Sequence, residues 1–514
     1  MSRLARSHGR AAVARAALAV GALAVAAAGL AAAGCTREVG TLSIALLRPL
    51  WVSQDPFTAQ GGVADLASLR VRVEADDLGV VEQSFPYDPG GASHLGAIAV
   101  GDGRVITVEG LNASDNVLFR GRSLPVTIRA GHNAISLYVS HLGFSLASTP
   151  MAAPRFGHTA TVLADGRVLL AGGAATVVQL PGDPAPALVD EAAGAEIFHP
   201  TSAASVATVR ATPRAFHAAV RLGARVLLSG GLGVDGLAPP AELFDPTTGM
   251  GLAPDAGLPM PRAHHAAAPL AGGGALVAGG TSSTGAVLSA AEVISEDQAC
   301  GFACSTDAPM AAPRSGLQLT PLPDGTLLVT GGLQDEAGTL APGAELYDPA
   351  TRSFRSVGEP LYPRAFHTAT ALDDGRVVLI GGLFAGAGAG PGGLEPCPYI
   401  EVYDPATESF AVPESIDAVL RVARWRHTAT LLPDGTILVV GGWSTDPGLP
   451  LPEAVPRAER VRPRFDFATS EDANMTVPRA GHTATLLGNG MVLIAGGAAQ
   501  IDSEVTDVAE IYNP

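Results

Sequence analysis

PRAFHTATALDDGRVVLIGGL, residues Pro363 to Leu383, is the stretch of sequence that decides the fold. Its first part, HTATAL, alternates apolar and polar residues as a half-buried β-strand does. The pair Asp374-Gly375 follows, and such pairs accept the positive φ values of a tight hairpin turn. RVVLI then predicts a strand buried on both faces, which ends at a pair of glycines. The stretch therefore predicts a β-hairpin with a buried second strand.

Six related stretches occur elsewhere in the chain. Histidine follows the first arginine by three residues in six of the seven copies, and Leu317 takes its place in the fourth. Each copy continues to a third strand with a glutamate, often within AELYDP, and to an irregular fourth strand. A repeat of about 50 residues indicates stacked supersecondary units, and four antiparallel strands per unit predict an all-β, seven-bladed β-propeller. The repeated residues are Arg155, Arg214, Arg262, Arg314, Arg364, Arg424 and Arg479; His158, His217, His265, His367, His427 and His482; and Glu196, Glu242, Glu292, Glu345, Glu401, Glu459 and Glu510.

The repeat resembles the kelch motif, and the form HTATLLPDG with its glycine pair is similar to blades of the galactose oxidase propeller. The resemblance covers residues 143–514 and implies a kelch-type propeller there. Most copies lack the tryptophan that many kelch motifs carry in the fourth strand. The sequence ends at AEIYNP, the third strand of the seventh copy, and GFSLASTPMAAPR resembles the segment before the fifth copy. We therefore expect residues 143–148 to supply the missing fourth strand.

The first 34 residues have the pattern of a secretory signal. Four arginines precede an apolar run over residues 16–33, which ends in AAAGC. This ending resembles the lipobox of bacterial lipoproteins, which implies that Cys35 is lipidated. The alternatives are an uncleaved anchor helix, since 18 apolar residues can just span a bilayer, and a plain signal peptide. Each alternative places the folded part outside the cytoplasm. If Cys35 is lipidated, as the resemblance implies, the protein is anchored to the bacterial outer membrane or cell surface.

Residues 35–142 have a different texture. SLRVRVEA, RVITVEGL, PVTIRA and NAISLYV are short alternating segments at regular spacing, separated by turn residues. This pattern predicts a β-sandwich. It looks like the immunoglobulin-like or transthyretin-like modules that often precede surface domains, and we expect it to act as a spacer between membrane and propeller.

Charge and cysteine usage exclude several classes of function. The formal net charge is −17, and it becomes −21 if the signal and its four arginines are removed. Such an acidic chain is a poor partner for nucleic acid. Cys300 and Cys304, in CGFAC, predict a local disulfide outside the cytoplasm. Cys397 is expected to be a lone thiol, and CGFAC alone offers too few ligands for a metal site.

The arginine, histidine and glutamate of the repeat are residue types that can do acid–base chemistry. They recur in nearly every copy, whereas an active site occurs once, so we interpret them as structural. The galactose oxidase resemblance implies a copper ion held by two tyrosines and two histidines. No tyrosine precedes the repeated histidine or leucine, so neither copper nor any other cofactor is expected. The preceding residues are Gly157, Phe216, His264, Gly316, Phe366, Arg426 and Gly481.

Residues that differ between copies are the candidates for ligand binding. We expect the loops after the glycine pairs to share one end of the ring, with long loops in copies one, five and six. Exposed aromatics beside charges can stack on a sugar or anchor a protein. The candidates are Trp425, Arg426, Trp443, Asp446 and Tyr399; the alternative is that these aromatics pack under their own loops. The sequence thus predicts a non-catalytic surface lipoprotein that binds a protein or polysaccharide. A carbohydrate-active enzyme (a sugar mutarotase or oxidase-like) and a purely architectural envelope protein remain the alternatives.

Overall fold

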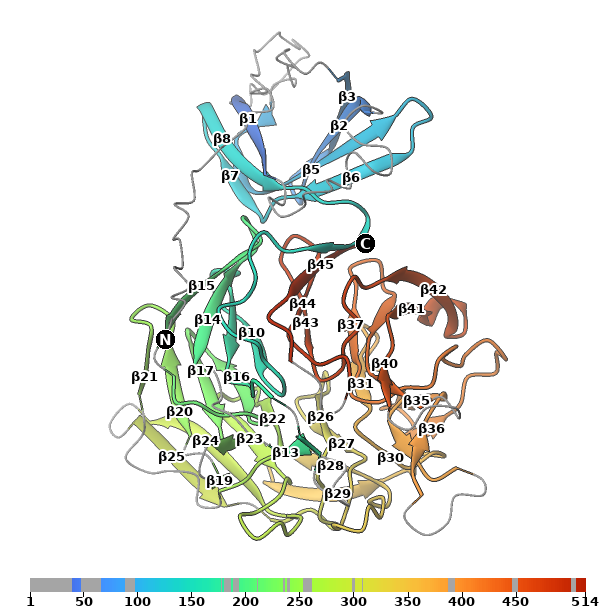
Figure 1. Ribbon diagram of the computed structural model, residues 1–514. Helices are drawn as coiled ribbons and strands as arrows, with labels where there is room; N and C mark the ends of the chain where they lie inside the picture. Colours follow the sequence, from blue (N-terminus) through green and yellow to red (C-terminus); the bar gives the residue numbers. More distant parts are fainter. Residues whose placement is uncertain are drawn as a thin grey trace, which may run out of the picture.

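The structure is a computed structural model. It describes residues 39–47, 66–87, 98–176, 178–179, 186–187, 194–209, 211–233, 236–237, 241–252, 261–297, 301–306, 308–386, 393–445, 452–500 and 505–514. These residues form an all-β protein of many small sheets (Figure 1). The predicted signal and Cys35 lie outside them. Within them, no helix has the length and apolar character needed to cross a bilayer.

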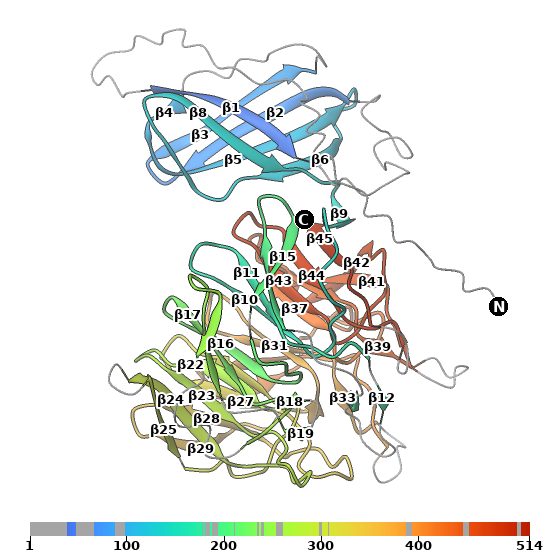
Figure 2. The same ribbon diagram turned by 60° about the vertical axis from the view of Figure 1, so that its left-hand side comes forward.

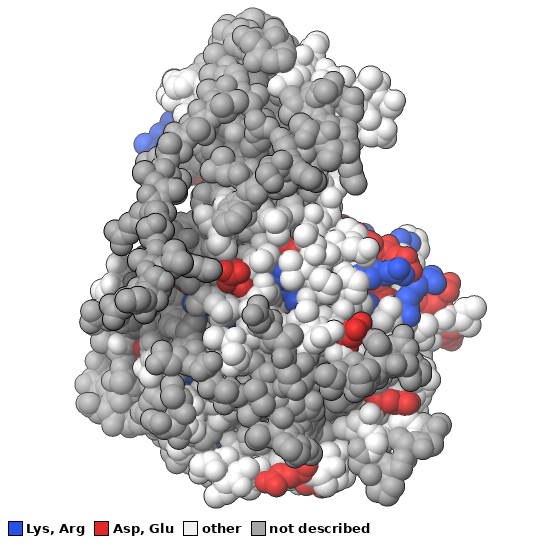
Figure 3. Space-filling view, viewed as in Figure 1, with Lys and Arg blue, Asp and Glu red and all other residues white. Residues whose placement is uncertain are grey.

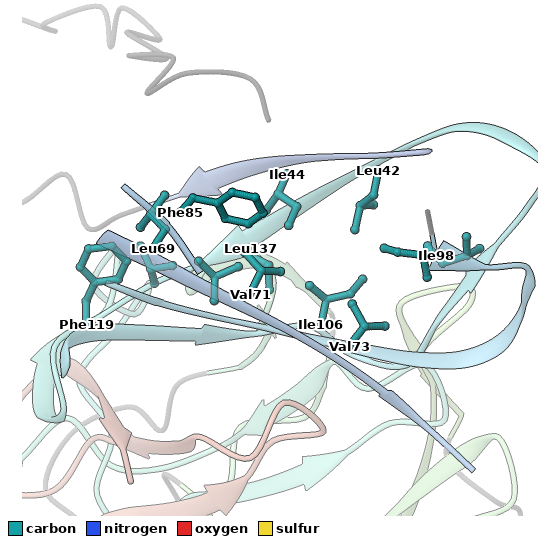
Figure 4. Packing of buried hydrophobic residues seen from close by; sticks show 13 residues of the cluster. Leu42, Ile44, Leu69, Val71, Val73, Phe85, Ile98, Ile106, Phe119 and Leu137 are labelled. Carbon is teal, nitrogen blue, oxygen red and sulfur yellow. The ribbon is translucent and has the colours of Figure 1, made fainter. Parts of the chain in front are cut away.

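The N-terminal strands form two sheets that share one core. One sheet has the order β4-β1-β8, in which β1 and β8 run parallel, and the other has the order β3-β2-β5-β6 with β7 paired to β5. Leu42 and Ile44 of one sheet face Val71, Val73 and the other side chains of the second across this core (Figure 4). The bounds are β1 Val39–Leu47, β2 Leu66–Ala75, β3 Leu78–Pro86, β4 Ile98–Ala99, β5 Gly101–Asn112, β6 Val117–Arg122, β7 Val126–Ile128 and β8 Gly131–Tyr138.

The rest of the described chain contains seven four-stranded antiparallel sheets. The first sheet consists of β10 Thr159–Val162, β11 Val168–Ala171, β14 Ala195–His199 and β15 Ala204–Val209, and the second of β16 Ala218–Leu222, β17 Arg225–Ser229, β20 Glu242–Asp245 and β21 Met250–Leu252. The third consists of β22 Ala266–Pro269, β23 Ala275–Ala278, β24 Ala291–Asp297 and β25 Gly301–Thr306, and the fourth of β26 Gln318–Pro321, β27 Leu327–Thr330, β28 Ala344–Asp348 and β29 Ser353–Val357. The fifth sheet consists of β31 Thr368–Ala371, β32 Val377–Ile380, β35 Ile400–Asp404 and β36 Ser409–Ala411. The sixth consists of β37 Thr428–Leu431, β38 Ile437–Val440, β41 Arg457–Arg462 and β42 Ala468–Asn474, and the seventh of β43 Thr483–Leu486, β44 Val492–Ala495, β45 Ala509–Asn513 and β9 Gly143–Leu146.

The predicted origin of the last fourth strand is confirmed. β9 pairs antiparallel with β45, with Phe144 opposite Tyr512 and Leu146 opposite Glu510. Figure 2 shows β9 beside β45, next to the N-terminal strands. The first strands of successive sheets are neighbours, in the order β10, β16, β22, β26, β31, β37 and β43, and β43 in turn contacts β10. The sheets therefore follow one another in a cycle.

The core of this part is divided among the seven spaces between neighbouring sheets. Each space holds its own cluster of buried apolar side chains. In β32, Val377 and Leu379 pack toward the fourth sheet, while Val378 and Ile380 pack toward the sixth. Side chains alternate across a strand, so a strand with a core on each side is apolar at every position. This explains the unbroken apolar runs of the second strands.

The glycine pairs and the connections that enter the first strands lie at one end of the sheets, which we call the loop face. The hairpin turns such as Asp374-Gly375 lie at the other end, the turn face. After several glycine pairs the chain forms a small ribbon on the loop face. These ribbons are β12 Val178–Gln179 with β13 Pro186–Ala187, β18 Leu232–Gly233 with β19 Gly236–Leu237, β30 Arg364–Ala365 with β33 Leu383–Phe384 and β34 Glu395–Pro396, and β39 Trp443–Ser444 with β40 Glu453–Ala454.

The N-terminal sheets rest on the seventh sheet. The Asn513 side-chain amide donates to Arg120 O at 2.9 Å and to Ser140 O at 3.1 Å, and Arg120 donates to Pro514 O at 2.5 Å. Tyr138, at the end of β8, is buried in the cluster that β11 and β44 share. Buried polar contacts of this kind fix the position of the N-terminal sheets more firmly than the predicted role of a spacer requires.

Candidate functional site

A buried arginine–glutamate pair recurs in each of the seven sheets. In the seventh sheet Arg479 Nη2 lies 2.7 Å from Glu510 Oε1, and both side chains are fully buried. Arg479 also donates to Gly496 O and Val508 O, and Glu510 accepts the N–H of Thr476. Each pair thus connects several segments of its own sheet, in agreement with the predicted structural role. The other pairs are Arg155–Glu196, Arg214–Glu242, Arg262–Glu292, Arg314–Glu345, Arg364–Glu401 and Arg424–Glu459.

The second glycine of each pair connects its sheet to the next. Gly442 donates its N–H to Arg479 O at 3.0 Å, and Gly497 donates to Arg155 O at 2.8 Å, which joins the seventh sheet to the first. A Cβ atom on Gly496 would lie 2.3 Å from Arg155 O, and this close approach requires glycine. The remaining bonds join Gly173 to Arg214, Gly231 to Arg262, Gly280 to Arg314, Gly332 to Arg364 and Gly382 to Arg424.

The six repeated histidines bond to a hydroxyl group of the preceding sheet. His482 Nε2 lies 2.9 Å from Thr428 Oγ1, and His158 Nε2 lies 2.9 Å from Thr483 Oγ1. Burial, followed by the charges of nearby arginines, lowers the pKa of His158 to about 3. The imidazole is therefore neutral at pH 7 and suited to this bond. The other pairs are His217–Thr159, His265–Ser229, His367–Thr330 and His427–Thr368.

Leu317, which replaces histidine in the fourth sheet, has a local explanation. The hydroxyl group that bonds to each histidine occupies one of two positions in the preceding sheet. It belongs either to the first residue of the first strand or to the residue that pairs with that one at the end of the second strand. In the second sheet these positions hold Ala218 and Ser229. In the third sheet both are alanine, Ala266 and Ala278, and Leu317 packs in the same cluster. A histidine there would find no hydroxyl at either position.

One residue per sheet forms a closed ring of backbone hydrogen bonds around the axis. It is the residue before the repeated histidine or leucine, and its φ lies between 52° and 68° in all seven sheets. Each donates its N–H to the carbonyl of its counterpart in the preceding sheet, and Gly157 donates to Gly481 O at 3.4 Å. A Cβ atom on Gly316 would lie 2.5 Å from the Phe366 ring, so glycine is required there. The ring consists of Gly157, Phe216, His264, Gly316, Phe366, Arg426 and Gly481.

Four members of the ring carry side chains in the left-handed region, which costs about 1 kcal/mol for each such residue. The rings of Phe216 and His264 lie 4.5 Å apart. The Arg426 guanidinium carbon lies 4.6 Å from the Phe366 ring centroid and 5.8 Å from that of Phe216. Burial, and then the Arg426 charge, lowers the pKa of His264 to about 3. Aromatic and basic side chains therefore fill the axis at the loop face.

The expectation that Trp425 and Trp443 are exposed is wrong. Their exposed fractions are 7% and 1%. The two indoles lie 6.2 Å apart, and Trp443 stacks on Phe156 of the first sheet at 5.7 Å. They belong to the apolar cluster around the axis, because these two positions form a bridge on the inner side of the loop face. The alternative interpretation, in which the aromatics pack under their own loops, is correct that the tryptophans are buried, but they pack around the axis, where Trp443 meets Phe156 of the first sheet.

Tyr399 is placed differently from the tryptophans. It is half-buried, and its ring stacks on that of Tyr362 at 4.1 Å with an angle of 11°. Phe384 meets both tyrosines edge-on, at 6.0 and 5.7 Å. Among the predicted candidates, Asp446 lies outside the described residues and Arg426 lies at the axis. Tyr399 is thus the described candidate that joins a partly exposed aromatic group on the loop face.

Tyr362 and Phe384 are residues that the sequence interpretation missed. Tyr362 lies two residues before the repeated arginine, Phe384 two after the glycine pair, and Tyr399 two before the repeated glutamate. The other six copies have no aromatic residue at any of these positions, which hold Ala153, Thr212, Met260, Ala312, Val422 and Val477; Ala175, Gly233, Ser282, Gln334, Ser444 and Ala499; and Gly194, Pro240, Ala290, Gly343, Arg457 and Val508. Comparing the copies position by position would have found this group.

The described residues offer little for acid–base or metal chemistry. Their buried carboxylates are the seven repeated glutamates, each bound to its arginine. No group of three or more histidine, cysteine, aspartate or glutamate residues within this part of the chain could hold a metal ion. Cys397 is a buried free thiol. Cys304 lies in β25 opposite Ile294, and Cys300 is outside the described residues, so their disulfide stays a prediction.

Charged side chains of both signs gather over β41 and β42 (Figure 3). Arg460 lies 3.0 Å from Asp434 and also contacts Asp472, and Tyr512 of the seventh sheet bonds to Asp472 at 2.6 Å. Burial raises the pKa of the Tyr512 phenol, and the hydrogen bond to Asp472 adds to this rise. These charges pair with one another within the sixth sheet, and the Tyr512 hydroxyl connects them to the seventh, which is a structural arrangement.

Comparison with known proteins adds no relative whose function could be transferred to this site. The sequence matches no protein-family model and no curated protein.

Proposed function

We propose that this chain is a non-catalytic, extracytoplasmic binding module. In this proposal a lipid-anchored β-sandwich carries a seven-bladed kelch-type β-propeller, which binds a protein or polysaccharide on its loop face. The cyclic order of the seven sheets, the seven separate cores between them and the closed ring of backbone bonds support the propeller. The kelch-like repeat supports the same architecture.

The observation that carries the proposed function is the aromatic group of Tyr362, Phe384 and Tyr399. These residues occupy three equivalent positions of the repeat, and only the fifth copy has aromatics there. The buried arginines, histidines and glutamates recur from sheet to sheet, whereas this group does not. Unlike the equally unrepeated Trp425 and Trp443, its members are partly exposed, so burial in the core does not account for them. Partly exposed aromatic side chains of this kind contribute most of the binding energy at many interfaces.

The binding site is tested with the full mature protein and three single variants. We expect a ligand found on a glycan array or a peptide array to lose about tenfold or more in affinity in Tyr399→Ala and in Tyr362→Ala. Phe465→Ala is the control, because Phe465 is 70% exposed and lies in the short helix η2 (Pro463–Phe465) on the turn face. If all three variants bind the ligand as tightly as wild type does, the proposed site in the fifth sheet is wrong.

The proposed anchor is tested at Cys35. We expect an alkyne-labelled fatty acid to be incorporated into the wild-type chain and to be absent from Cys35→Ala. The variant should also move from the membrane fraction to the soluble fraction of the envelope. Equal labelling of both proteins would contradict the lipobox assignment and leave the binding proposal unaffected.

A further inference from the structure

Two exposed aliphatic residues adjoin the aromatic group of the fifth sheet, one as a chain neighbour and one through a backbone bridge, and we call the five residues together the sheet-5 patch. It consists of Leu361, Tyr362, Phe384, Tyr399 and Val419. Leu361 precedes Tyr362 and is 68% exposed, and Val419 is 36% exposed and forms a bridge with Tyr399. The patch thus combines aromatic rings with aliphatic side chains that offer no hydrogen bond.

The backbone of Leu361, Tyr362 and Tyr399 is held by two buried side chains beneath the patch. Leu361 and Tyr362 both donate their backbone N–H to the Glu401 carboxylate, at 2.6 and 3.3 Å. The Tyr399 carbonyl accepts a bond from Arg364 at 2.8 Å. Arg364 and Glu401 are themselves buried and paired, so they hold the patch without adding charge to its surface. A surface fixed in this way loses little conformational entropy when a partner binds.

Three exposed acidic side chains lie near the patch, and one exposed basic side chain, Arg421, lies two residues after Val419. Glu395 lies opposite Phe384 in the β33–β34 ribbon and is exposed. Glu359 precedes Leu361 by two residues, and Asp417 precedes Val419 by two residues; both are exposed. The whole chain carries a net charge of −17. The electrostatic surroundings therefore favour a partner with positive charge beside its apolar contact.

We propose that the sheet-5 patch docks a polypeptide segment that carries an apolar anchor residue flanked by arginine or lysine. This inference rests on the proposed binding function of the loop face and specifies the partner. The apolar anchor covers Leu361 and Val419 and packs on the tyrosine stack, while the basic residues reach Glu395 and Glu359. A sugar would leave the two aliphatic side chains without a matching surface, since its hydroxyl groups need hydrogen-bond partners. The aliphatic component thus favours a polypeptide.

The test uses a phage-displayed library of random 12-residue peptides, selected on the full mature protein with its N-terminal sheets. We expect the enriched peptides to be net positive and to share an apolar residue. A synthetic peptide of the consensus sequence should bind wild type, and Tyr399→Ala and Leu361→Ser should each weaken it about tenfold. Glu395→Gln should weaken it several-fold and reduce its dependence on salt. Phe465→Ala should bind as wild type does.

The outcomes separate this inference from the proposed function. No enrichment, acidic consensus peptides, or peptide binding that Tyr399→Ala leaves unchanged would each overturn the polypeptide partner. If a glycan array instead gives a ligand that is lost in Tyr399→Ala, the inference fails and the proposed binding function stands. If peptide and glycan ligands are both found and no sheet-5 variant affects any of them, both proposals fail.

Discussion

At the scale of single residues, the exception in the repeat leads to a testable rule. Leu317 follows a sheet whose two hydroxyl positions are both alanine, so Leu317→His alone should bury an imidazole without its hydroxyl partner. We expect it to lower the free energy of unfolding by about 1 to 3 kcal/mol. Adding Ala266→Thr should restore about 1 kcal/mol, because it places a hydroxyl where His482 and its counterparts find one.

Urea unfolding of wild type, both single variants and the double variant measures this coupling as a double-mutant cycle. Ala266→Thr alone is the control for the cost of the new side chain. A coupling energy of zero would contradict the rule that histidine requires a hydroxyl from the preceding sheet.

The same scale shows what could and could not be predicted from the sequence. The repeat predicts the buried Arg424–Glu459 pairs and their counterparts as structural residues, because the residues recur in every copy. It does not show that Trp443 points inward, since burial of this residue depends on Phe156 of the first sheet, which is almost 300 residues away in the chain. A comparison of the copies position by position identifies Tyr362 and Phe384 as exceptional, but not their contacts with Tyr399, which form only when the loop-face ribbon folds.

At the scale of elements, β9 determines whether the seventh sheet is complete. Without it, β45 presents an open edge, which exposes backbone donors and acceptors and promotes association. We expect a chain of residues 148–514 to melt at a lower temperature and to self-associate more than a chain of residues 142–514. Light scattering and thermal unfolding measure the two effects. Both chains lack the N-terminal sheets, so the difference reports on β9 and the adjoining Ala147, whose N–H bonds to Ala509 O.

A synthetic peptide of residues 141–149 provides the complementary measurement. Added in excess to the 148–514 chain, it should raise the melting temperature and suppress association, because Phe144 restores its contact with Tyr512 at 4.9 Å between ring centroids. The same peptide with Phe144→Ser should rescue less. No rescue by either peptide, in a 148–514 chain that is folded, would contradict the role of β9.

The periodicity of the sequence predicts the seven sheets. Each copy of the repeat contains a second strand that is apolar at every position, as a strand with a core on each side must be. The pairing of β1 with β8 in parallel does not follow from it, since alternating segments such as NAISLYV specify a strand without its partner or direction.

At the scale of the whole molecule, Asn513 joins the N-terminal sheets to the cycle of seven. Its amide is 2% exposed and bonds to Ser140 and Arg120. Asn513→Ala should remove the side-chain bonds across the contact, while the Arg120 and Ser140 carbonyls keep their backbone donors, and weaken the contact by about 1 kcal/mol. Differential scanning calorimetry should then show the N-terminal sheets unfolding at a lower temperature than the rest, whereas the control Asn116→Ala, at an exposed position between β5 and β6, should leave the separation of the transitions unchanged. A wild-type profile retained in Asn513→Ala would contradict this coupling.

The histidines that lie between the sheets make the stability of the whole cycle dependent on pH. Burial, and then neighbouring arginine charges, lowers the pKa of His158 and His367 to about 3 and that of His482 well below its usual value. Because the folded pKa is lower than the unfolded value of about 6.5, the unfolded chain binds more protons below pH 6.5. The stabilisation is therefore complete above that pH and is lost as the pH falls toward 3, by up to about 1.4 kcal/mol per pH unit for each histidine.

Urea midpoints at pH 7, 6 and 5 measure this loss. We expect the midpoint to fall from pH 7 to 5, and we expect a steeper fall between pH 6 and 5 than between pH 7 and 6. His367→Leu should reduce the pH dependence by the share of one histidine, although it also lowers stability at pH 7 by leaving Thr330 without this bond. His132→Gln is the control, because it removes a histidine that is exposed in β8 and lies outside the cycle of seven sheets. Equal midpoints at pH 7 and pH 5 would show that the buried imidazoles do not control the stability of the cycle.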